Sequence, residues 1–187
     1  MNTECGIIHK RSQGLIDFAY SYAKEAHKTQ VRRYTGEPYI THPVAVARLV
    51  ASVTNDCDMI VAALLHDTVE DTEVTQEQIF NAFGFRAAQM VQELTEFSIP
   101  TDGNHAIRKE LDRRYLERAS SQTKTIKLAD CIHNSESILL YGKGFKHTYM
   151  KEMIKLQPTL KQGNKELFVK FQRICIDYKA CKAYNEI

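Results

Sequence analysis

The hydrophobic positions of this chain repeat with the period of an α-helix along most of its length. In the first such segment the apolar residues recur at i, i+3, i+4 and i+7, and they are Leu15, Phe18, Ala19, Tyr22, Ala23 and Ala26. A polar stretch from about Lys28 to Thr41 then predicts a loop. A second helix is predicted over Val44–Val53, because Pro43 suits a first helical turn, where its missing N–H is not needed.

The next segment is apolar on every side. Seven consecutive apolar residues, Met59–Leu65, follow Asp56-Cys57-Asp58, whose acidic side chains suit a helix N-terminus. A helix that is hydrophobic all round is buried, so this segment predicts the central helix of the fold. We expect that helix to continue through His66 and Asp67, which would then lie in its C-terminal half.

The rest of the chain also predicts helices. Thr75 and Gln78 have the spacing of a capping box, at the start of a short helix that ends near Gly84. Further helices are predicted at about 85–96, 105–119, 123–141, 147–161 and 164–183, with a loop at Ile99–Gly103. No segment alternates as a strand does. The expected fold is all-α, a single compact helical bundle with one domain over residues 1–187.

Composition and charge exclude several classes of protein. A hydrophobic content of 43% and a charged content of 26% are ordinary for a globular domain, and a net charge of +2 favours neither nucleic acid nor a membrane surface as partner. No apolar run approaches the roughly 18 residues of a membrane span, and the N-terminus does not resemble a signal peptide. The five cysteines contain no CxxC motif and indicate reduced thiols. We therefore expect a cytoplasmic protein.

The candidate chemistry is concentrated after the apolar helix. Glu70 and Asp71 follow His66 and Asp67 at i+4, so on a helix each acidic residue lies above its partner on the same face. Asp130 likewise ends an apolar run, and His42 precedes Pro43 at a helix start. Two histidines and two aspartates form a mixed nitrogen and oxygen ligand set, which suits Mn, Fe or Zn better than Ca.

Each of these residues also has a plainer interpretation. A His-Asp pair is usually an incidental surface or capping pair, and a lone loop histidine such as His42 is ordinarily no ligand. A solvated or capped carboxylate is the ordinary interpretation of Asp130. The acidic run Glu70–Glu73 is also typical of a helix end. A cationic cluster on one predicted helix, made of Arg108, Lys109, Arg113 and Arg114, either draws a polyphosphate or is simply a solvated face.

Three stretches considered together favour the functional interpretation. Thr35–Pro43, Ala62–Thr72 and Lys127–Asn134 closely resemble, in order and spacing, signature stretches of the hydrolase domain of the RelA/SpoT family and its stand-alone relatives, the small alarmone hydrolases. That group belongs to the HD-domain metal phosphohydrolases, so the resemblance implies an HD-domain fold. It covers about residues 12–141 and does not extend to the C-terminal helices at about 145–187.

The resemblance implies a metal centre and a reaction. In the family a metal ion, usually manganese, is held by the positions that match His42, His66, Asp67 and Asp130, although another divalent metal is compatible with them. The positions that match Glu70 and Asp71 orient and activate the attacking water. The implied activity is release of the 3′-pyrophosphate from ppGpp or pppGpp. A bound cation suits this chemistry because it lowers the pKa of its water and polarises phosphoryl oxygens.

The resemblance also implies contacts to a small-molecule nucleotide. Arg33 matches an arginine that stacks on the base, Asn134 matches a contact to the sugar or phosphate region, and Ser137 is a weaker candidate of the same kind. Tyr34 stands where long family members commonly carry lysine, and Cys131 stands where a basic residue is usual. These departures leave open whether the alarmone carries guanine or adenine (ppApp).

Two further functional interpretations stay open. The same site suits another nucleotide, such as NADPH or a nucleoside monophosphate, although Glu70 and Asp71 favour the pyrophosphohydrolase. A non-catalytic nucleotide-binding module is the other, and it would be favoured by the loss of a ligand or of the acid pair, neither of which is missing. A homo-oligomer is also left open.

Overall fold

The computed structural model describes the backbone of residues 2–142 and 144–185, and the side chains of residues 12–142 and 144–181. Within the described residues the chain forms helices and no strand, so the predicted all-α class is confirmed. The chain divides into two compact units, unit 1 from Met1–Arg32 with Glu37–Thr95, and unit 2 from Arg33–Gly36 with Glu96–Ile187. A single domain over the whole chain stays a prediction.

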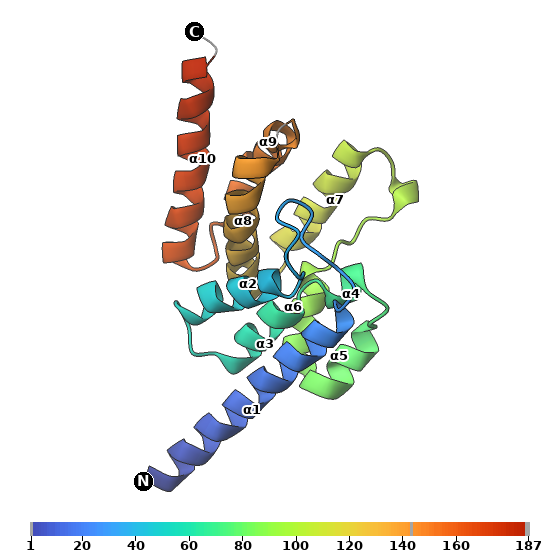
Figure 1. Cartoon of the computed structure of the whole chain (residues 1–187), viewed down its shortest axis with the longest axis vertical. Coiled ribbons are helices and arrows are strands. Elements are labelled where there is room, and N and C mark those ends of the chain that lie inside the picture. Colours follow the sequence, from blue (N-terminus) through green and yellow to red (C-terminus); the bar gives the residue numbers. More distant parts are fainter. Residues whose placement is uncertain (1, 143, 186–187) are drawn as a thin grey trace. The chain divides into compact units, whose positions relative to one another are not determined.

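Unit 1 is built around one buried helix. Its elements are α1 (Asn2–Ala26), α2 (Thr41–Ala51), α3 (Cys57–Leu65), α4 (Thr68–Asp71), α5 (Gln76–Phe83) and α6 (Phe85–Leu94). Helix α3 packs against α1, α2 and α6 (Figure 1). Its residues Val61, Ala62, Ala63 and Leu65 are fully buried, which confirms the central helix predicted from its apolar run.

A capped N-terminus fixes the start of α3. The Asp56 Oδ1 atom accepts hydrogen bonds from the backbone N–H groups of Asp58 and Met59 at 3.0 and 3.4 Å. Its Oδ2 atom accepts from the Arg86 guanidinium at 2.8 Å, and Asp58 accepts from the same guanidinium at 2.8 Å. One arginine of α6 is therefore tied to the two carboxylates that begin α3. The capping box predicted at Thr75 and Gln78 is likewise confirmed at the start of α5.

The end of α3 differs from the prediction. The helix ends at Leu65 rather than continuing through His66 and Asp67, which form a turn before α4. The Thr68 hydroxyl donates to the Leu65 carbonyl at 2.6 Å, and Asp67 has φ −96° and ψ −5°, so a side chain has replaced the next helical bond. The Asp71 N–H nevertheless donates to the Asp67 carbonyl at 2.9 Å, which preserves their predicted i+4 relation.

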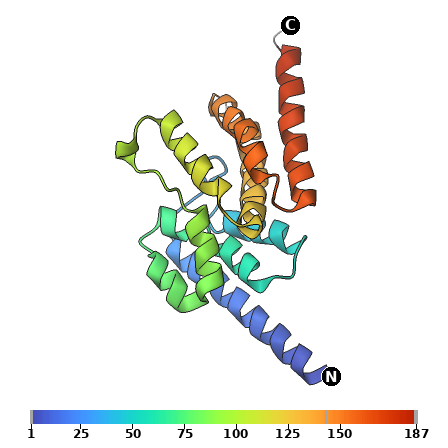
Figure 2. The same cartoon turned by 180° about the vertical axis from the view of Figure 1, so that it is seen from behind.

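Unit 2 is built around a long helix. Its elements are a 3₁₀ turn η1 (Pro100–Asp102), α7 (His105–Glu117), α8 (Ser121–Tyr141), α9 (Phe145–Leu160) and α10 (Lys165–Asn185). Helix α8 packs against both α9 and α10 (Figure 2). Ile126, Leu128 and Ile132 on α8 are fully buried, together with Phe171 of α10. The predicted helices of this half are thus confirmed, with bounds that shift by a few residues.

A buried lysine joins three elements of unit 2. Lys124, 2% exposed, donates from Nζ to the Glu117 carbonyl at 2.9 Å and to Gln162 Oε1 at 2.5 Å. The last turn of α7, the first turn of α8 and the loop between α9 and α10 therefore share one ammonium group. A buried charge is tolerated here because hydrogen bonds replace those it made to water.

Three cations of the predicted cluster on α7, Lys109, Arg113 and Arg114, are paired with carboxylates of unit 2. Arg113 donates to Glu110 at 2.7 Å and pairs with Glu117, while Arg114 pairs with Glu110 at 2.9 Å. Hydrogen bonds from both arginines lower the pKa of Glu110 to about 2. Lys109 forms an ion pair with Glu96. This favours a salt-bridged, solvated helix face over a surface that draws polyphosphate.

Two further observations concern the cysteines and the helices of the described residues. Cys57, Cys131, Cys175 and Cys181 are free thiols. None of the helices described combines the length and the apolarity that crossing a bilayer requires.

The cap of α3 makes a testable prediction about stability. Asp56→Ala removes both the cap and the arginine partner, and we expect it to lower the free energy of unfolding by about 1 to 2 kcal/mol. Asp56→Asn keeps an acceptor for the helix and is expected to lose less than half of that. Urea unfolding followed by circular dichroism measures both. Asn55→Ala, an exposed change next to the cap, is the control and should stay within about 0.5 kcal/mol of the wild type.

Candidate metal centre

Three side chains of unit 1 converge at the end of α3. His42 comes from α2, and His66 and Asp67 come from the turn between α3 and α4. Each offers one ligand atom, and these atoms all lie within 4.8 Å of one another. Both imidazoles are buried, whereas Asp67 is half-buried. The structure thus brings together three of the four ligands that the resemblance implies.

The Asp67 carboxylate lies between the two imidazoles. Its Oδ1 atom is 3.1 Å from His66 Nε2, and its Oδ2 atom is 3.5 Å from His42 Nε2. The Nδ1 atom of His66 lies 2.9 Å from the Ala63 carbonyl, which can only accept, so Nδ1 carries the hydrogen. In the neutral ring, Nε2 therefore directs its lone pair at the carboxylate.

This arrangement fits a divalent metal ion. A lone pair and a carboxylate oxygen 3.1 Å apart repel each other unless a cation, either a proton or a metal ion, acts between them. Two imidazole nitrogens and one carboxylate oxygen form a donor set that suits borderline divalent metals. The bond from His66 Nδ1 to a backbone carbonyl is also the usual way in which a protein orients a histidine ligand.

A tyrosine that the sequence analysis did not single out touches this cluster. The Tyr39 hydroxyl lies 2.7 Å from Asp67 Oδ2 and 3.1 Å from Asp71 Oδ2, and donates to both carboxylates. Burial and the charge of Asp67 raise the pKa of Tyr39 far above its ordinary value, so the hydroxyl keeps its proton. A signal was present in the sequence, because Tyr39 lies three residues before His42 in one of the quoted stretches.

The two predicted catalytic acids lie on the short helix α4. Glu70 is exposed, and the Asp71 carboxylate accepts the hydrogen bond from Tyr39. Partial removal from water and the nearby charge of Asp67 raise the pKa of Asp71 above its usual range. A raised pKa makes a carboxylate a better proton acceptor near neutral pH, as general-base catalysis requires.

The remaining predicted ligand, Asp130, belongs to unit 2. It is buried in α8, where its Oδ2 atom is 2.8 Å from Lys127 Nζ and its Oδ1 atom accepts from Asn134 Nδ2 at 2.6 Å. Ser137 donates to the Asn134 carbonyl at 3.2 Å. Within α8, Asn134 thus orients the Asp130 carboxylate, and Lys127 is a partner that sequence reasoning missed. Metal ligation by Asp130 and nucleotide contacts by Asn134 and Ser137 stay predictions.

Arg33 and Tyr34 form a pair of their own. The Arg33 guanidinium lies 5.7 Å from the centroid of the Tyr34 ring, within cation–π range. Arg33 is exposed and Tyr34 is half-buried, in a turn where Gly36 adopts a φ of 73°. The exposed guanidinium plane is compatible with stacking on a base, which stays a prediction.

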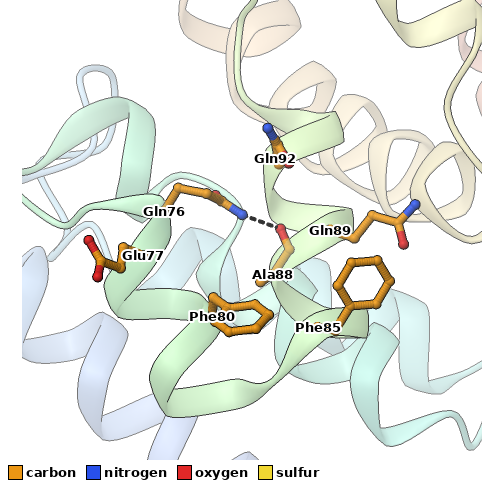
Figure 3. A pocket seen from close by; sticks show the side chains of 7 residues that line it. All are labelled: Gln76, Glu77, Phe80, Phe85, Ala88, Gln89 and Gln92. Carbon is orange, nitrogen blue, oxygen red and sulfur yellow. Dashed lines mark hydrogen bonds between the residues drawn. The ribbon is translucent and has the colours of Figure 1, made fainter.

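A separate hollow lies between α5 and α6 (Figure 3). It is lined by Gln76, Glu77, Phe80, Phe85, Ala88, Gln89 and Gln92. The Gln76 side chain crosses it and donates to the Ala88 carbonyl at 2.6 Å, which ties the first turn of α5 to α6. None of the predicted site residues is among the lining residues, so this hollow is not the candidate centre.

Comparison with known proteins gives consistent results. A family model described as an HD domain matches residues 19–139. The chain is 36% identical over 148 residues to the guanosine-3′,5′-bis(diphosphate) 3′-pyrophosphohydrolase of Aquifex aeolicus (strain VF5), a match that covers 78% of this chain and 21% of that one. It is 35% identical over 130 residues to a probable GTP pyrophosphokinase of Mycobacterium leprae (strain TN), covering 69% of this chain and 16% of that one.

A solved structure is also similar. It is described as a metazoan ortholog of SpoT that hydrolyzes ppGpp and plays a role in starvation responses, and it superimposes with a TM-score of 0.80 at 26% identity. The match covers 88% of this chain and 95% of that one. By contrast, the chain spans only about a fifth of the length of the curated relatives it matches.

The cluster predicts that a divalent metal ion stabilises the protein. At a free metal concentration of about 100 times Kd, binding adds about 2.7 kcal/mol, which raises the Tm by about 5 to 10 °C for a chain of this size. Thermal unfolding of the metal-free protein with and without added Mn²⁺ measures this. Asp67→Asn keeps an acceptor for Tyr39 but should lose the rise. Asp58→Asn, at the other end of α3, should keep it, and an equal rise in both variants would place the ion elsewhere.

Proposed function

Because the chain belongs to the HD-domain family, we propose that it is a metal-dependent hydrolase that removes the 3′-pyrophosphate from (p)ppGpp-type alarmones. The observation that carries the proposal is the cluster of the buried His42 and His66 with the half-buried Asp67, to which a shared hydroxyl ties the Asp71 carboxylate. The name of the Aquifex relative and the description of the metazoan structure support the choice of substrate.

His42, His66 and Asp67 would hold the metal, which we propose to be Mn²⁺, with Asp130 as the fourth ligand implied by the resemblance. When bound, the ion polarises the phosphoryl oxygens and lowers the pKa of a water molecule. Two carboxylates of the chain then orient the water and accept its proton. Asp71, with its raised pKa, accepts a proton from the attacking water, and the exposed Glu70 on the same short helix orients that water.

The nucleotide contacts in this proposal come from the loop before α2 and from α8. Arg33 stacks on the base, Tyr34 lies beside it, and Asn134 and Ser137 contact the sugar or phosphate region. Tyr34 and Cys131 replace residues that are basic in long family members, so the proposal includes ppApp as well as ppGpp. The free thiols support a reducing compartment, and we assign the protein to the cytoplasm.

One comparison of substrates tests the function. Purified protein is incubated with ppGpp, ppApp and NADPH, with Mn²⁺ or with a chelator, and pyrophosphate and phosphate are measured separately. Metal-dependent release of pyrophosphate from an alarmone is the expected result, and the faster alarmone defines the base preference. Phosphate release from NADPH alone would contradict the proposal and indicate a different nucleotide phosphohydrolase. No release from any of the three would favour a non-catalytic nucleotide-binding module.

Glu70→Gln is expected to separate catalysis from metal binding. The change removes the carboxylate that orients the attacking water, and a misplaced water should lower kcat by roughly a hundredfold or more. The Mn²⁺-induced rise in Tm should remain, because Glu70 is not in the ligand cluster. Glu73→Gln, another exposed acid just after α4, is the matched control and should keep kcat. A fully active Glu70→Gln would contradict the assigned role.

A further inference from the structure

We propose that Tyr39 is a positioning residue, whose hydroxyl holds the metal-binding carboxylate of Asp67 and the water-activating carboxylate of Asp71 in one fixed relation. The inference rests on the proposed function and adds a residue to its machinery. The Tyr39 hydroxyl lies 2.7 Å from the Oδ2 atom of Asp67 and 3.1 Å from the Oδ2 atom of Asp71. It acts on the reaction only through those two side chains.

The hydroxyl selects one orientation of the Asp67 carboxylate. With Oδ2 bound to Tyr39 and 3.5 Å from His42 Nε2, the other oxygen faces His66 Nε2 at 3.1 Å. A rotation of the carboxylate plane by about 90° would break all three relations at once, because neither oxygen would then face its partners. A ligand oriented before the metal arrives loses less entropy when the metal binds, which is how outer-shell hydrogen bonds strengthen metal sites.

The ring of Tyr39 is itself held in place. It packs at 30° over the buried ring of His27, with the centroids 4.7 Å apart, and contacts the His42 ring edge to face at 5.9 Å. Its backbone N–H donates to the Gln30 carbonyl at 3.0 Å, and its carbonyl accepts from the His42 N–H at 2.9 Å. The position of the hydroxyl is therefore fixed by contacts that do not involve the hydroxyl.

The loop between α1 and α2 also holds the backbone of Asp71, through a contact that does not involve Tyr39. The Gln30 side chain donates to the Asp71 backbone carbonyl at 2.6 Å, and its oxygen accepts from His27 Nδ1 at 2.7 Å. The Asp71 N–H is bound to the Asp67 carbonyl. The backbone of Asp71 is thus anchored without Tyr39, so loss of the hydroxyl alone releases the carboxylates and leaves the fold.

Electrostatics explains why a donor is needed between these groups. Asp67 and Asp71 carry like charges, and the charge of Asp67 raises the pKa of Asp71. Two carboxylate oxygens that approach the same point repel each other. A single hydroxyl hydrogen between them reduces that repulsion and keeps both oxygens directed at one place.

The test is Tyr39→Phe, which removes the hydroxyl and keeps the ring on His27. Calorimetric titration of the metal-free protein with Mn²⁺ measures affinity, and steady-state hydrolysis of ppGpp measures kcat and KM. We expect Mn²⁺ to bind about 10- to 100-fold more weakly. At saturating Mn²⁺, we also expect kcat to fall about tenfold or more while KM changes by less than about threefold. The Tm of the metal-free protein should change by less than about 3 °C.

Tyr20→Phe on α1 is the matched control, because it removes an exposed tyrosine hydroxyl of the same unit far from these contacts in sequence. It should leave every value unchanged. A Tyr39→Phe protein with wild-type Mn²⁺ affinity and wild-type kcat would overturn the inference. So would a lower Tm of the metal-free protein as the only effect, because it would show a packing role.

A double-mutant cycle tests whether the hydroxyl acts through Asp71. Asp71→Asn alone should lower kcat, and Tyr39→Phe added to it should lower kcat little further, because the carboxylate that it positions is gone. Fully additive effects would overturn the link to Asp71.

The Mn²⁺ titration separates this inference from the proposed function. Weaker binding by Tyr39→Phe in a protein that cleaves no alarmone would support the positioning of Asp67 while the substrate assignment fails. Unchanged binding and turnover by Tyr39→Phe in a protein that does cleave ppGpp would overturn the inference alone.

Discussion

The contact on which the candidate centre depends is that of one carboxylate with two imidazoles. Asp67 lies between His42 and His66, with an oxygen directed at an Nε2 atom on either side. Because the His66 Nδ1 hydrogen is directed at a backbone carbonyl, the facing nitrogen can offer only a lone pair in the neutral ring. The arrangement therefore calls for a cation. Both rings are buried, so water only weakly screens the repulsion between the imidazole lone pair and the carboxylate.

In unit 1 this contact lies at the end of the apolar helix α3. Helix α3 is buried by α1, α2 and α6, and its first turn is capped by Asp56 and held by Arg86 of α6. The helix ends at Leu65, whose carbonyl accepts a hydrogen bond from the Thr68 hydroxyl. This turn releases His66 and Asp67 from the helical path, while the bond from Asp71 to Asp67 restores the spacing of the acids. The loop after α1 then supplies Tyr39.

Unit 2 has an ordered acidic group of its own. Asp130 is buried in α8 with both oxygens engaged, one by Lys127 and the other by Asn134. A buried carboxylate with two donors on its own helix keeps one orientation, which suits the ligand role that the resemblance implies. The share of each relative that is matched also matters, because the match covers 21% of the Aquifex relative and 16% of the Mycobacterium relative. Substrate and activity are accordingly proposals for this chain.

The sequence by itself determined the elements and the chemical candidates. Helical periodicity, the apolar run before His66 and the capping residues at Asp56 and Thr75 depend on neighbours within a few positions, and local rules describe them well. The tertiary structure alone decided which distant groups meet. The bond from Tyr39 to Asp67 joins residues 28 positions apart, and the ion pair of Lys109 with Glu96 spans a loop. A periodic pattern has no information about such pairs. The end of α3 at Leu65 also depends on one hydrogen bond, from the Thr68 hydroxyl to the Leu65 carbonyl, because helix propensity is weak beside a specific hydrogen bond.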